Sequence, residues 1–207
     1  MPYIIRRMVK EDLEQVNEID HEAFPTQWPP ANYKQELQNK IAYYIVQCDS
    51  TRILPASGRP PKQNNSFISR LMPWVKKPNA APLLPTPRHC ITGFAGIWML
   101  AGEGHITNIA VRGEYRGRRL GELLLLATID LGQSLDAMFM TLEVRASNIV
   151  AQALYNKYGF TEMGVRKGYY LDNHENAIIM STETLKSDTY QARLRELREA
   201  LEKNPPG

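Results

Sequence analysis

Apolar residues in this 207-residue chain recur at two spacings, and each spacing predicts one kind of element. Leu120, Leu123, Leu124 and Ala127 repeat at intervals of three and four residues, which is the period of an amphipathic helix. Segments such as Thr141–Val144 alternate instead and are rich in residues that favour strands. The pattern predicts strands at 3–8, 42–48, 91–100, 105–111, 138–144, 161–170 and 176–184, and helices at 9–23, 32–38, 120–134, 148–158 and 188–203.

The predicted order of elements, β-α-α-β-β-β-α-β-α-β-β followed by one more helix, is that of an α/β fold with helices on both faces of a mixed central sheet. The strand–helix–strand–helix run in its middle implies a short parallel section, with antiparallel strands on both sides. We therefore expect one domain over residues 1–186, interrupted by an insertion at 50–89, and a C-terminal helical extension over 187–207.

Charge and proline set residues 51–90 apart from the rest of the chain. This stretch contains seven Lys or Arg, no Asp or Glu and eight of the fourteen prolines, whereas the other residues carry a net −4 within a total of +3. Its segment SFISRLMPWVKK, Ser66–Lys77, joins apolar residues to three cations and could contact an anionic partner such as lipid or ribosomal RNA. The alternative is a flexible loop whose apolar residues fold back on the domain, which the prolines favour because they limit any helix to about two turns.

The composition narrows the class of protein further. A hydrophobic content of 43% is enough for a core, and no apolar run approaches the roughly 18 residues of a membrane-spanning helix. The N-terminal residues lack the apolar centre of a signal peptide, and two cysteines cannot form a disulfide framework, so we expect both to be reduced and buried. His105, His174 and Glu175 do not have metal-ligand spacing. These features favour a cytoplasmic enzyme or binding protein with no metal, no DNA partner and no stable membrane insertion.

The segment TLEVRASNIVAQALYNKYGF, Thr141–Phe160, combines a strand, a helix cap and a helix with two chemically active side chains. Glu143 lies at the strand end, and Ser147 or Asn148 can cap the following helix by accepting a hydrogen bond from its free N–H groups. Tyr155 lies seven residues after Asn148, about two helical turns, and so shares its face. A carboxylate beside a phenol suits a proton-transfer site.

A purely structural role accounts for the same pair. Glu143 could be a surface acid paired with Arg145, and Tyr155 could be a core residue whose hydroxyl has a partner. The spacing alone does not separate the two interpretations.

A basic, glycine-containing turn, Arg116–Gly121, connects the strand at 105–111 to the helix that begins near Leu120. Free backbone N–H groups and the helix dipole favour an anion at such a helix start. Gly117 and Gly121 allow close approach of the backbone, and the arginines add attraction for a diphosphate. The turn is neither a Walker loop nor a G-x-G-x-x-G fingerprint, and a solvated basic turn that caps a helix is the alternative.

Together these motifs resemble a known superfamily. The strand ending NIAV followed by YRGRRLG resembles the acetyl-CoA motif of the GNAT N-acetyltransferases, Q/R-x-x-G-x-G/A, with Arg119 at its first glycine and Gly121 at its second. LEVRASN, ALYNKYGF, YY and AIIM are similar to the RimI-type ribosomal-protein-alanine N-acetyltransferases, and more loosely to archaeal and eukaryotic N-terminal acetyltransferases. The resemblance covers Ile91–Thr184 strongly and Tyr3–Cys48 weakly, and it implies a GNAT-like fold in a single N-acetyltransferase domain.

The resemblance also implies roles for individual residues. Glu143 would act as general base and Tyr155 as general acid, with acetyl-CoA as co-substrate and no metal. At Arg119 the backbone N–H would serve the diphosphate while the side chain points to solvent. The substrate N-terminus would contact four aromatic residues, for which packing within the fold is the alternative: Phe24, Trp28, Tyr169 and Tyr170. Acetyl-CoA would contact the strand end, the turn and the helix cap: Ile109, Ala110, Val111, Arg116, Gly117, Arg118, Arg119, Leu120, Gly121, Glu122 and Asn148.

We therefore expect an acyltransferase that moves an acetyl group from acetyl-CoA to the N-terminal α-amine of a protein, and more narrowly to the N-terminal alanine of a small-subunit ribosomal protein. Two alternatives stay open. One is a GNAT that acetylates a small-molecule amine or a lysine side chain. The other is a ribosome- or RNA-associated module with weak catalysis, in which the basic insertion is the working part.

Overall fold

A computed structural model of the chain describes residues 2–26, 31–54 and 88–207. Trp28 and the segment Ser66–Lys77 lie outside the described residues. No helix within the described ranges is long and apolar enough to span a membrane.

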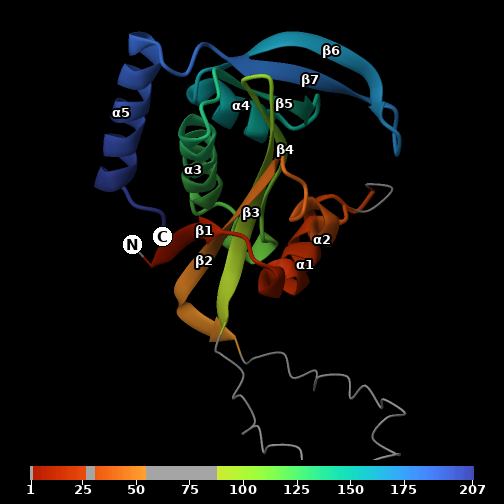
Figure 1. Cartoon of the computed structure of the whole chain (residues 1–207), viewed down its shortest axis with the longest axis vertical. Coiled ribbons are helices and arrows are strands. Elements are labelled where there is room, and N and C mark those ends of the chain that lie inside the picture. The colour runs from red at the N-terminus through yellow and green to blue at the C-terminus, as the bar shows by residue number, and fades with distance from the viewer. Residues whose placement is uncertain (1, 27–30, 55–87) are drawn as a thin grey trace, which may run out of the picture.

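A seven-stranded mixed sheet forms the centre of the molecule, with the strand order β1-β2-β3-β4-β5-β7-β6 (Figure 1). β4 and β5 pair in parallel, and every other neighbouring pair is antiparallel. This confirms the predicted mixed sheet with its short parallel section. The strands are β1 (Tyr3–Arg7), β2 (Ala42–Leu54), β3 (Arg88–Leu100), β4 (Glu103–Val111), β5 (Phe139–Arg145), β6 (Phe160–Tyr170) and β7 (Glu175–Thr182).

Helices cover both faces of the sheet, as the order of elements predicts (Figure 1). Buried residues of α1 and α2 pack with Tyr44 and Val46 of β2 on one face, whereas α3, α4 and α5 share a core with Ile45 on the other. Adjacent residues of β2 belong to different cores because side chains alternate along a strand. The helices are α1 (Leu13–Ala23), α2 (Tyr33–Glu36), α3 (Leu120–Ser134), α4 (Ile149–Lys157) and α5 (Asp188–Lys203).

β2 and β3 extend furthest beyond the bounds that the hydrophobic pattern predicts. β2 continues to Leu54 and β3 begins at Arg88, and these two residues pair with each other. The predicted insertion, 50–89, therefore begins and ends inside strands, because backbone pairing continues there after the apolar pattern has stopped. In the sequence a proline follows Leu54 and another precedes Arg88, and proline lacks the N–H that a strand ladder needs.

α1 and α2 are shorter than predicted by three or more residues each, and α4 is shorter by one residue at each end. The first begins as a 3-10 turn at Lys10–Asp12 before α1 starts, and α2 keeps a single turn. Asn32 caps α2 by accepting from the N–H of Gln35 at 3.2 Å. The cap fixes where the helix starts, and the helix ends at Glu36, two residues before the predicted end.

α5 packs into the main core. Its residues Tyr190, Leu194 and Leu201 are buried in one cluster with side chains of α3 and α4, and Figure 1 shows α5 alongside α3. The Tyr190 hydroxyl donates to the carbonyl oxygen of Tyr158 at 3.1 Å. Gly159 ends α4 with a left-handed φ of 82°, and a Cβ at that position would lie 2.9 Å from the Tyr190 ring.

Both cysteines are free and buried, as expected. Cys48 on β2 and Cys90 on β3 expose 1% and 2% of their surface. Burial also raises the pKa of the Cys48 thiol.

The parallel strands β4 and β5 pair over only part of their length and then diverge. Their register ends with Ile106 opposite Leu142. Directly after Ile106, a register shift against β3 leaves Thr107 as a β-bulge, which bends the strand. Beyond this point β4 and β5 no longer pair with each other. The backbone groups and side chains with which they face each other are therefore not used in pairing between them.

Candidate active site

Glu143 lies on β5 directly after the point at which β4 and β5 diverge. Its side chain is 11% exposed, with one carboxylate oxygen 3.0 Å from His105 Nε2 and the other 3.1 Å from Arg166 Nη2. The hydrogen bond to His105 and the charge of Arg166 hold the pKa of Glu143 below its ordinary value, although burial acts in the opposite direction. The carboxylate is therefore ionised at neutral pH and able to accept a proton.

Arg145 does not form the surface pair with Glu143 that a purely structural role would use. It pairs instead with Asp172 at 3.0 Å and with Glu175 at 3.1 Å. The charged partners of Glu143 are thus His105 on β4 and Arg166 on β6.

His105 on β4 belongs to the site, and sequence reasoning missed it. It lies opposite Thr141 in the parallel register, with Nδ1 2.8 Å from the Thr141 hydroxyl oxygen, and that hydroxyl donates in turn to Glu103. Glu143 follows two residues later on the same face of β5. Strand alternation gave part of this signal, but the register that brings His105 to Glu143 cannot be read from the local sequence.

Tyr170 interacts electrostatically with Tyr155, and Glu143 interacts in the same way with Tyr170. Tyr155 is buried on α4, with its ring centroid 5.8 Å from that of Phe160. Burial raises the pKa of the Tyr155 hydroxyl, and Tyr170 adds to the rise. Burial also raises the pKa of Tyr170 to about 12, and Glu143 contributes. Both phenols stay protonated at neutral pH, so the region holds a carboxylate acceptor and phenol donors.

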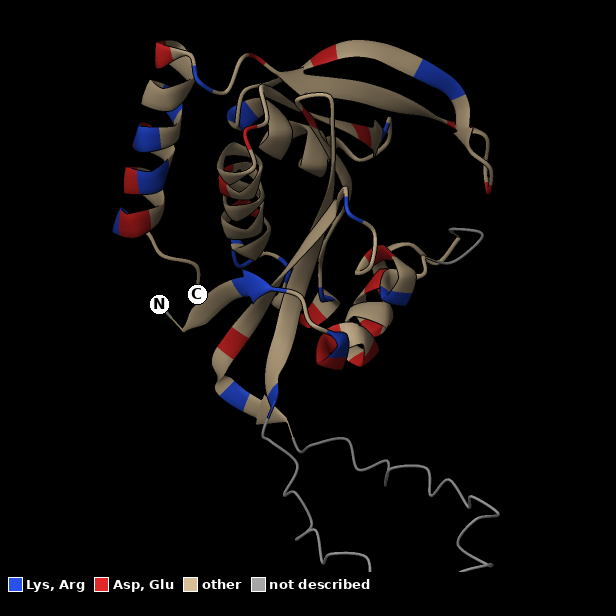
Figure 2. Cartoon of the chain, in the orientation of Figure 1, with Lys and Arg blue, Asp and Glu red and all other residues tan. Residues whose placement is uncertain are grey.

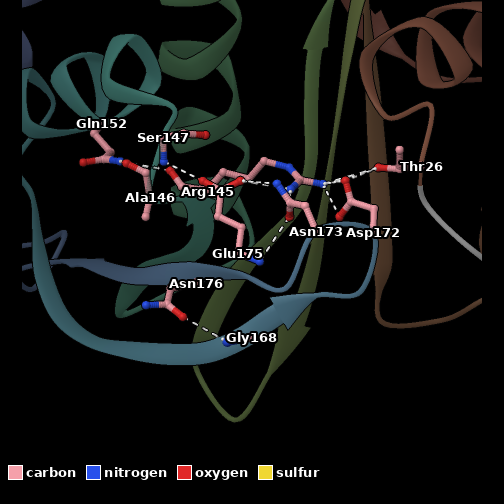
Figure 3. Close-up of polar contacts among 10 residues, drawn as sticks. All are labelled: Thr26, Arg145, Ala146, Ser147, Gln152, Gly168, Asp172, Asn173, Glu175 and Asn176. Carbon is pink, nitrogen blue, oxygen red and sulfur yellow. Dashed lines mark hydrogen bonds and ion pairs between the residues drawn. The ribbon is translucent and has the colours of Figure 1, made fainter.

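The structure brings two of the predicted substrate residues to this region. Tyr169 and Tyr170 lie at the end of the β6–β7 hairpin, in an edge-to-face contact with centroids 5.2 Å apart. Phe24, at the end of α1, packs against the core cluster under α1 and α2. Just beyond it, Thr26 donates to Asp172 of the hairpin at 2.9 Å, so the end of α1 and the hairpin meet (Figure 3).

The turn at 116–121 has the backbone of an anion cradle. Gly117 and Arg119 adopt left-handed φ angles of 77° and 62°, and Arg119 directly precedes α3. Glycine adopts this conformation freely, whereas another residue pays about 1–2 kcal/mol. Arg119 therefore adopts a backbone conformation that glycine favours, at the position where the motif has its first glycine.

The Arg119 side chain does not point freely to solvent, contrary to expectation. Its Nε donates to Glu122 at 3.1 Å, and its Nη1 donates to the carbonyl oxygen of Asn204 at 2.5 Å. Glu122 is buried, is also paired with Lys157, and accepts from the Tyr158 hydroxyl at 3.2 Å. Burial acts to raise the pKa of Glu122, but Lys157 and Arg119 hold it below its ordinary value. The Glu122 side chain therefore stabilises the fold around the turn.

Several of the other predicted cofactor residues lie in or beside this turn. Arg116 Nε donates to the carbonyl oxygen of Val111 at 2.9 Å, and the Arg118 guanidinium lies 5.1 Å from the ring centroid of Tyr115. Asn148 caps α4 by accepting from a backbone N–H at 3.2 Å. The remaining residues lie at the end of β4 or in the first turn of α3: Ile109, Ala110, Leu120 and Gly121.

A hollow of about 490 Å³ lies against this turn, lined by Gly117, Arg118, Arg119 and Gly207. A Cβ added at Gly117 would meet nothing within 4 Å, so the backbone there is open to a ligand. Figure 2 shows basic residues at the start of α3. Cations and the N–H groups of a helix start fit a diphosphate. Among the residues with a described position, no group of three could hold a metal ion.

A protein-family model described as "Acetyltransferase (GNAT) family" matches residues 13–160. The chain belongs to this family. A Bacillus subtilis (strain 168) protein provisionally named a ribosomal protein bS18-alanine N-acetyltransferase is 33% identical over 177 residues, 85% of this GNAT chain and 92% of that protein. The ribosomal protein bS18-alanine N-acetyltransferase of Salmonella typhimurium is 34% identical over 141 residues, 64% of this chain and 92% of that protein.

A solved structure confirms the GNAT fold. The crystal structure of the ribosomal-protein-S18-alanine N-acetyltransferase from Escherichia coli aligns with a TM-score of 0.60 at 23% identity, covering 90% of this chain and 97% of the other. The family match and the relatives together identify this GNAT protein as an N-acetyltransferase, as its motifs predicted.

Proposed function

We propose that this GNAT enzyme transfers the acetyl group of acetyl-CoA to the α-amine of a protein N-terminus, and specifically to the N-terminal alanine of ribosomal protein bS18. Enzymes of the family use acetyl-CoA, and the names of the relatives support the substrate. The observation that carries the reaction is Glu143, an ionised and nearly buried carboxylate where β4 and β5 diverge.

Glu143 is the general base in this proposal. A peptide α-amine has a pKa of about 7.7–8.0, so much of it is protonated at neutral pH and only modest assistance is needed. The ammonium form first loses a proton to solvent; as the nitrogen of the neutral amine bonds to the thioester carbon, Glu143 accepts the proton that this nitrogen loses, directly or through a water. His105 and Arg166 hold the carboxylate in place from both sides.

Tyr155 is the general acid. Its hydroxyl donates a proton to the departing sulfur as the C–S bond breaks, and its raised pKa ensures that the proton is present beforehand. Solvent then carries a proton from Glu143 to Tyr155. Over one cycle, a proton moves from the amine to the sulfur and both side chains return to their starting states.

The end of β4 and the start of α3 position the co-substrate. Beyond Ile106, the N–H groups of β4 that face β5 are not used in pairing with it. One of them, within Ile109–Val111, donates to the thioester oxygen and stabilises the charge that develops there. Arg116, Arg118 and the free N–H groups of the helix start hold the diphosphate.

The substrate class is tested by acetyl transfer to synthetic peptides that begin with Ala, Ser or Met. Polyamines and N-terminally blocked peptides that contain lysine serve as competing substrates. We expect the highest kcat/KM for the peptide that begins with Ala. A higher value for a polyamine or a lysine side chain would overturn the proposal.

Removing either proton-transfer group is expected to abolish most of the activity. Glu143→Gln and Tyr155→Phe keep the side-chain shapes but remove the acceptor and the donor, so each should lower kcat by about 10²–10³-fold. Steady-state kinetics with the Ala peptide provides the measurement. Glu162→Gln, at an exposed position on β6, is the matched control and should retain full activity. Full activity in both active-site variants would contradict the assigned roles.

A further inference from the structure

Arg145, at the end of β5, makes polar contacts with four other side chains. It lies two residues after Glu143 on β5, so both side chains leave the same face of the sheet. Figure 3 shows its guanidinium among polar groups of two other segments. With the aromatic ring beneath it, these form a group that we call the Arg145 cluster: Thr26, Arg145, Tyr170, Asp172, Asn173 and Glu175.

The guanidinium of Arg145 uses both terminal nitrogens and its flat face. Nη2 lies 3.0 Å from each carboxylate oxygen of Asp172. Nη1 donates to Glu175 at 3.1 Å and to Asn173 at 3.2 Å. The Cζ atom lies 3.9 Å from the ring centroid of Tyr170. Lysine cannot reproduce this arrangement, because it has neither a planar face nor donors in a fixed fork.

These four partners all belong to the end of the β6–β7 hairpin. β6 is the edge strand of the sheet, and its register against β7 shifts just before Tyr170. Within the shifted stretch, the N–H of Gly168 donates to the side chain of Asn176 at 3.0 Å, as Figure 3 shows. At the tip, Leu171 is 79% exposed. Arg145 therefore attaches an otherwise exposed hairpin end to β5.

The cluster also includes the segment after α1. Thr26 donates to Asp172 at 2.9 Å and accepts from Arg145 at 3.4 Å. The main chain of Arg145 is held from the opposite side, because its carbonyl oxygen accepts from Gln152 of α4 at 2.9 Å. One side chain thus joins the end of β5, the hairpin end and the segment after α1.

The carboxylates of the cluster stay ionised. The hydrogen bond from Arg145 holds the pKa of Asp172 below its ordinary value. Hydrogen bonds from the side chain of Ser147, from its N–H at 2.6 Å and from Arg145 lower the pKa of Glu175 to about 2. The stabilisation from such lowered pKa values is complete above the ordinary carboxylate pKa and is lost only as the pH falls through the lowered one. The cluster is therefore intact across the neutral range.

We propose that Arg145 is a positioning residue that holds Tyr170 and the hairpin end in place for the substrate before it binds; this inference rests on the function proposed above. Tyr170 stacks on Arg145, whose side chain leaves the same face of β5 as that of Glu143, so fixing its ring fixes one wall of the site. A wall formed in advance spares the substrate the cost of ordering it, which raises apparent affinity. Because Arg145 takes no part in the bond changes, its loss alters peptide binding more than the chemical step.

Arg145→Lys keeps the charge and removes the fork and the stacking. We expect the KM for the Ala peptide to rise about tenfold or more, while kcat and the KM for acetyl-CoA stay within about twofold of the wild type. Asp172→Asn, a milder change at the hairpin, should shift the same KM in the same direction. Lys167→Ala, at an exposed position on the same hairpin, is the matched control and should change none of the three constants.

Hydrogen exchange provides a readout that does not depend on the identity of the substrate. In Arg145→Lys without ligands, the amides of 168–175 should exchange at least about tenfold faster, and those of α3 should not change. Unchanged exchange in the hairpin would overturn the proposal, and so would equal acceleration in α3, which indicates general loss of stability.

The two proposals fail in different ways. If the wild type acetylates a polyamine or lysine instead of the peptide, the proposed function is wrong, and the KM ratios are then measured with the amine that it accepts. If the wild type acetylates the Ala peptide but Arg145→Lys leaves its KM unchanged, the positioning role is wrong and the proposed function stands.

Discussion

At the scale of single residues, the lowered pKa of Glu143 bears on how easily it can assist different amines. A base with a lowered pKa is always ionised but removes protons weakly. An α-amine, with a pKa of about 7.7–8.0, needs little assistance to lose its proton, whereas a lysine ammonium, with a pKa of about 10.4, needs more. The contacts of Glu143 with His105 and Arg166 thus agree with an α-amine as acceptor.

His105→Phe tests this electrostatic control of Glu143. The change removes the hydrogen bond that contributes most to lowering the pKa and leaves the carboxylate buried, so the pKa of Glu143 should rise. A raised pKa means that the carboxylate becomes protonated, and activity falls, at a higher pH. In profiles of kcat/KM between about pH 5 and 9, the wild type should show only the rise due to the amine, and the variant should gain an acidic limb.

The control for this profile is His89→Phe, at an exposed position on β3. Its profile should overlay that of the wild type. Identical profiles for His105→Phe and the wild type would mean that His105 does not set the protonation of Glu143.

At the scale of elements, the turn into α3 contains a residue, Arg119, with a strained backbone and with side-chain hydrogen bonds that hold it in place. The backbone of Arg119 is left-handed. Its guanidinium donates both to Glu122 in α3 and to the carbonyl oxygen of Asn204 beyond α5, and so connects the two segments. The backbone strain and the side-chain bonds act in opposite directions on stability. Substitutions that remove the guanidinium in two different ways separate the two effects.

Arg119→Gly and Arg119→Ala both lose the side-chain bonds, but only glycine relaxes the backbone. Arg119→Gly should therefore be the more stable variant by about 1 kcal/mol in urea denaturation. Glu196, at an exposed position in the middle of α5, provides the matched pair. There the free energy of unfolding of Glu196→Ala should be about 1 kcal/mol higher than that of Glu196→Gly. The same order at both positions would show that Arg119 is not strained.

At the scale of the whole molecule, α5 completes the core formed with α3 and α4. Tyr190 is fully buried, fits against Gly159 and donates to the carbonyl oxygen of Tyr158. Arg198 of α5 also pairs with Asp130 of α3. The half of the sheet that carries Glu143 therefore depends on the last helix for part of its stability.

Tyr190→Ala is expected to destabilise the protein by about 3–5 kcal/mol, because it empties a packed site. Tyr190→Phe removes only the hydroxyl and should cost about 1 kcal/mol. Denaturation followed by circular dichroism gives both values. Leu100→Ala, at a side chain that is 67% exposed, should change stability by less than about 0.5 kcal/mol. A small effect of Tyr190→Ala would show that α5 is only loosely attached.

The sequence predicts the elements of this molecule better than their pairing. Periodic apolar residues place α3 and α5 at their observed bounds, and the motif around Glu143 and Tyr155 points to one region. The contact of His105 with Glu143 depends on the register of two strands joined through α3, which no local pattern encodes. The Arg145 cluster depends likewise on where the hairpin folds back.

The buried cysteines bear on how turnover can be followed. Each acetyl transfer releases CoA with a free thiol, and a chromogenic thiol reagent detects that product continuously. Cys48 and Cys90 add little background, because buried thiols that the reagent cannot reach react slowly. Once urea unfolds the chain, both sulfurs become available, and the same reagent then counts unfolded molecules. One dye therefore measures catalysis in buffer and the unfolded fraction in denaturant.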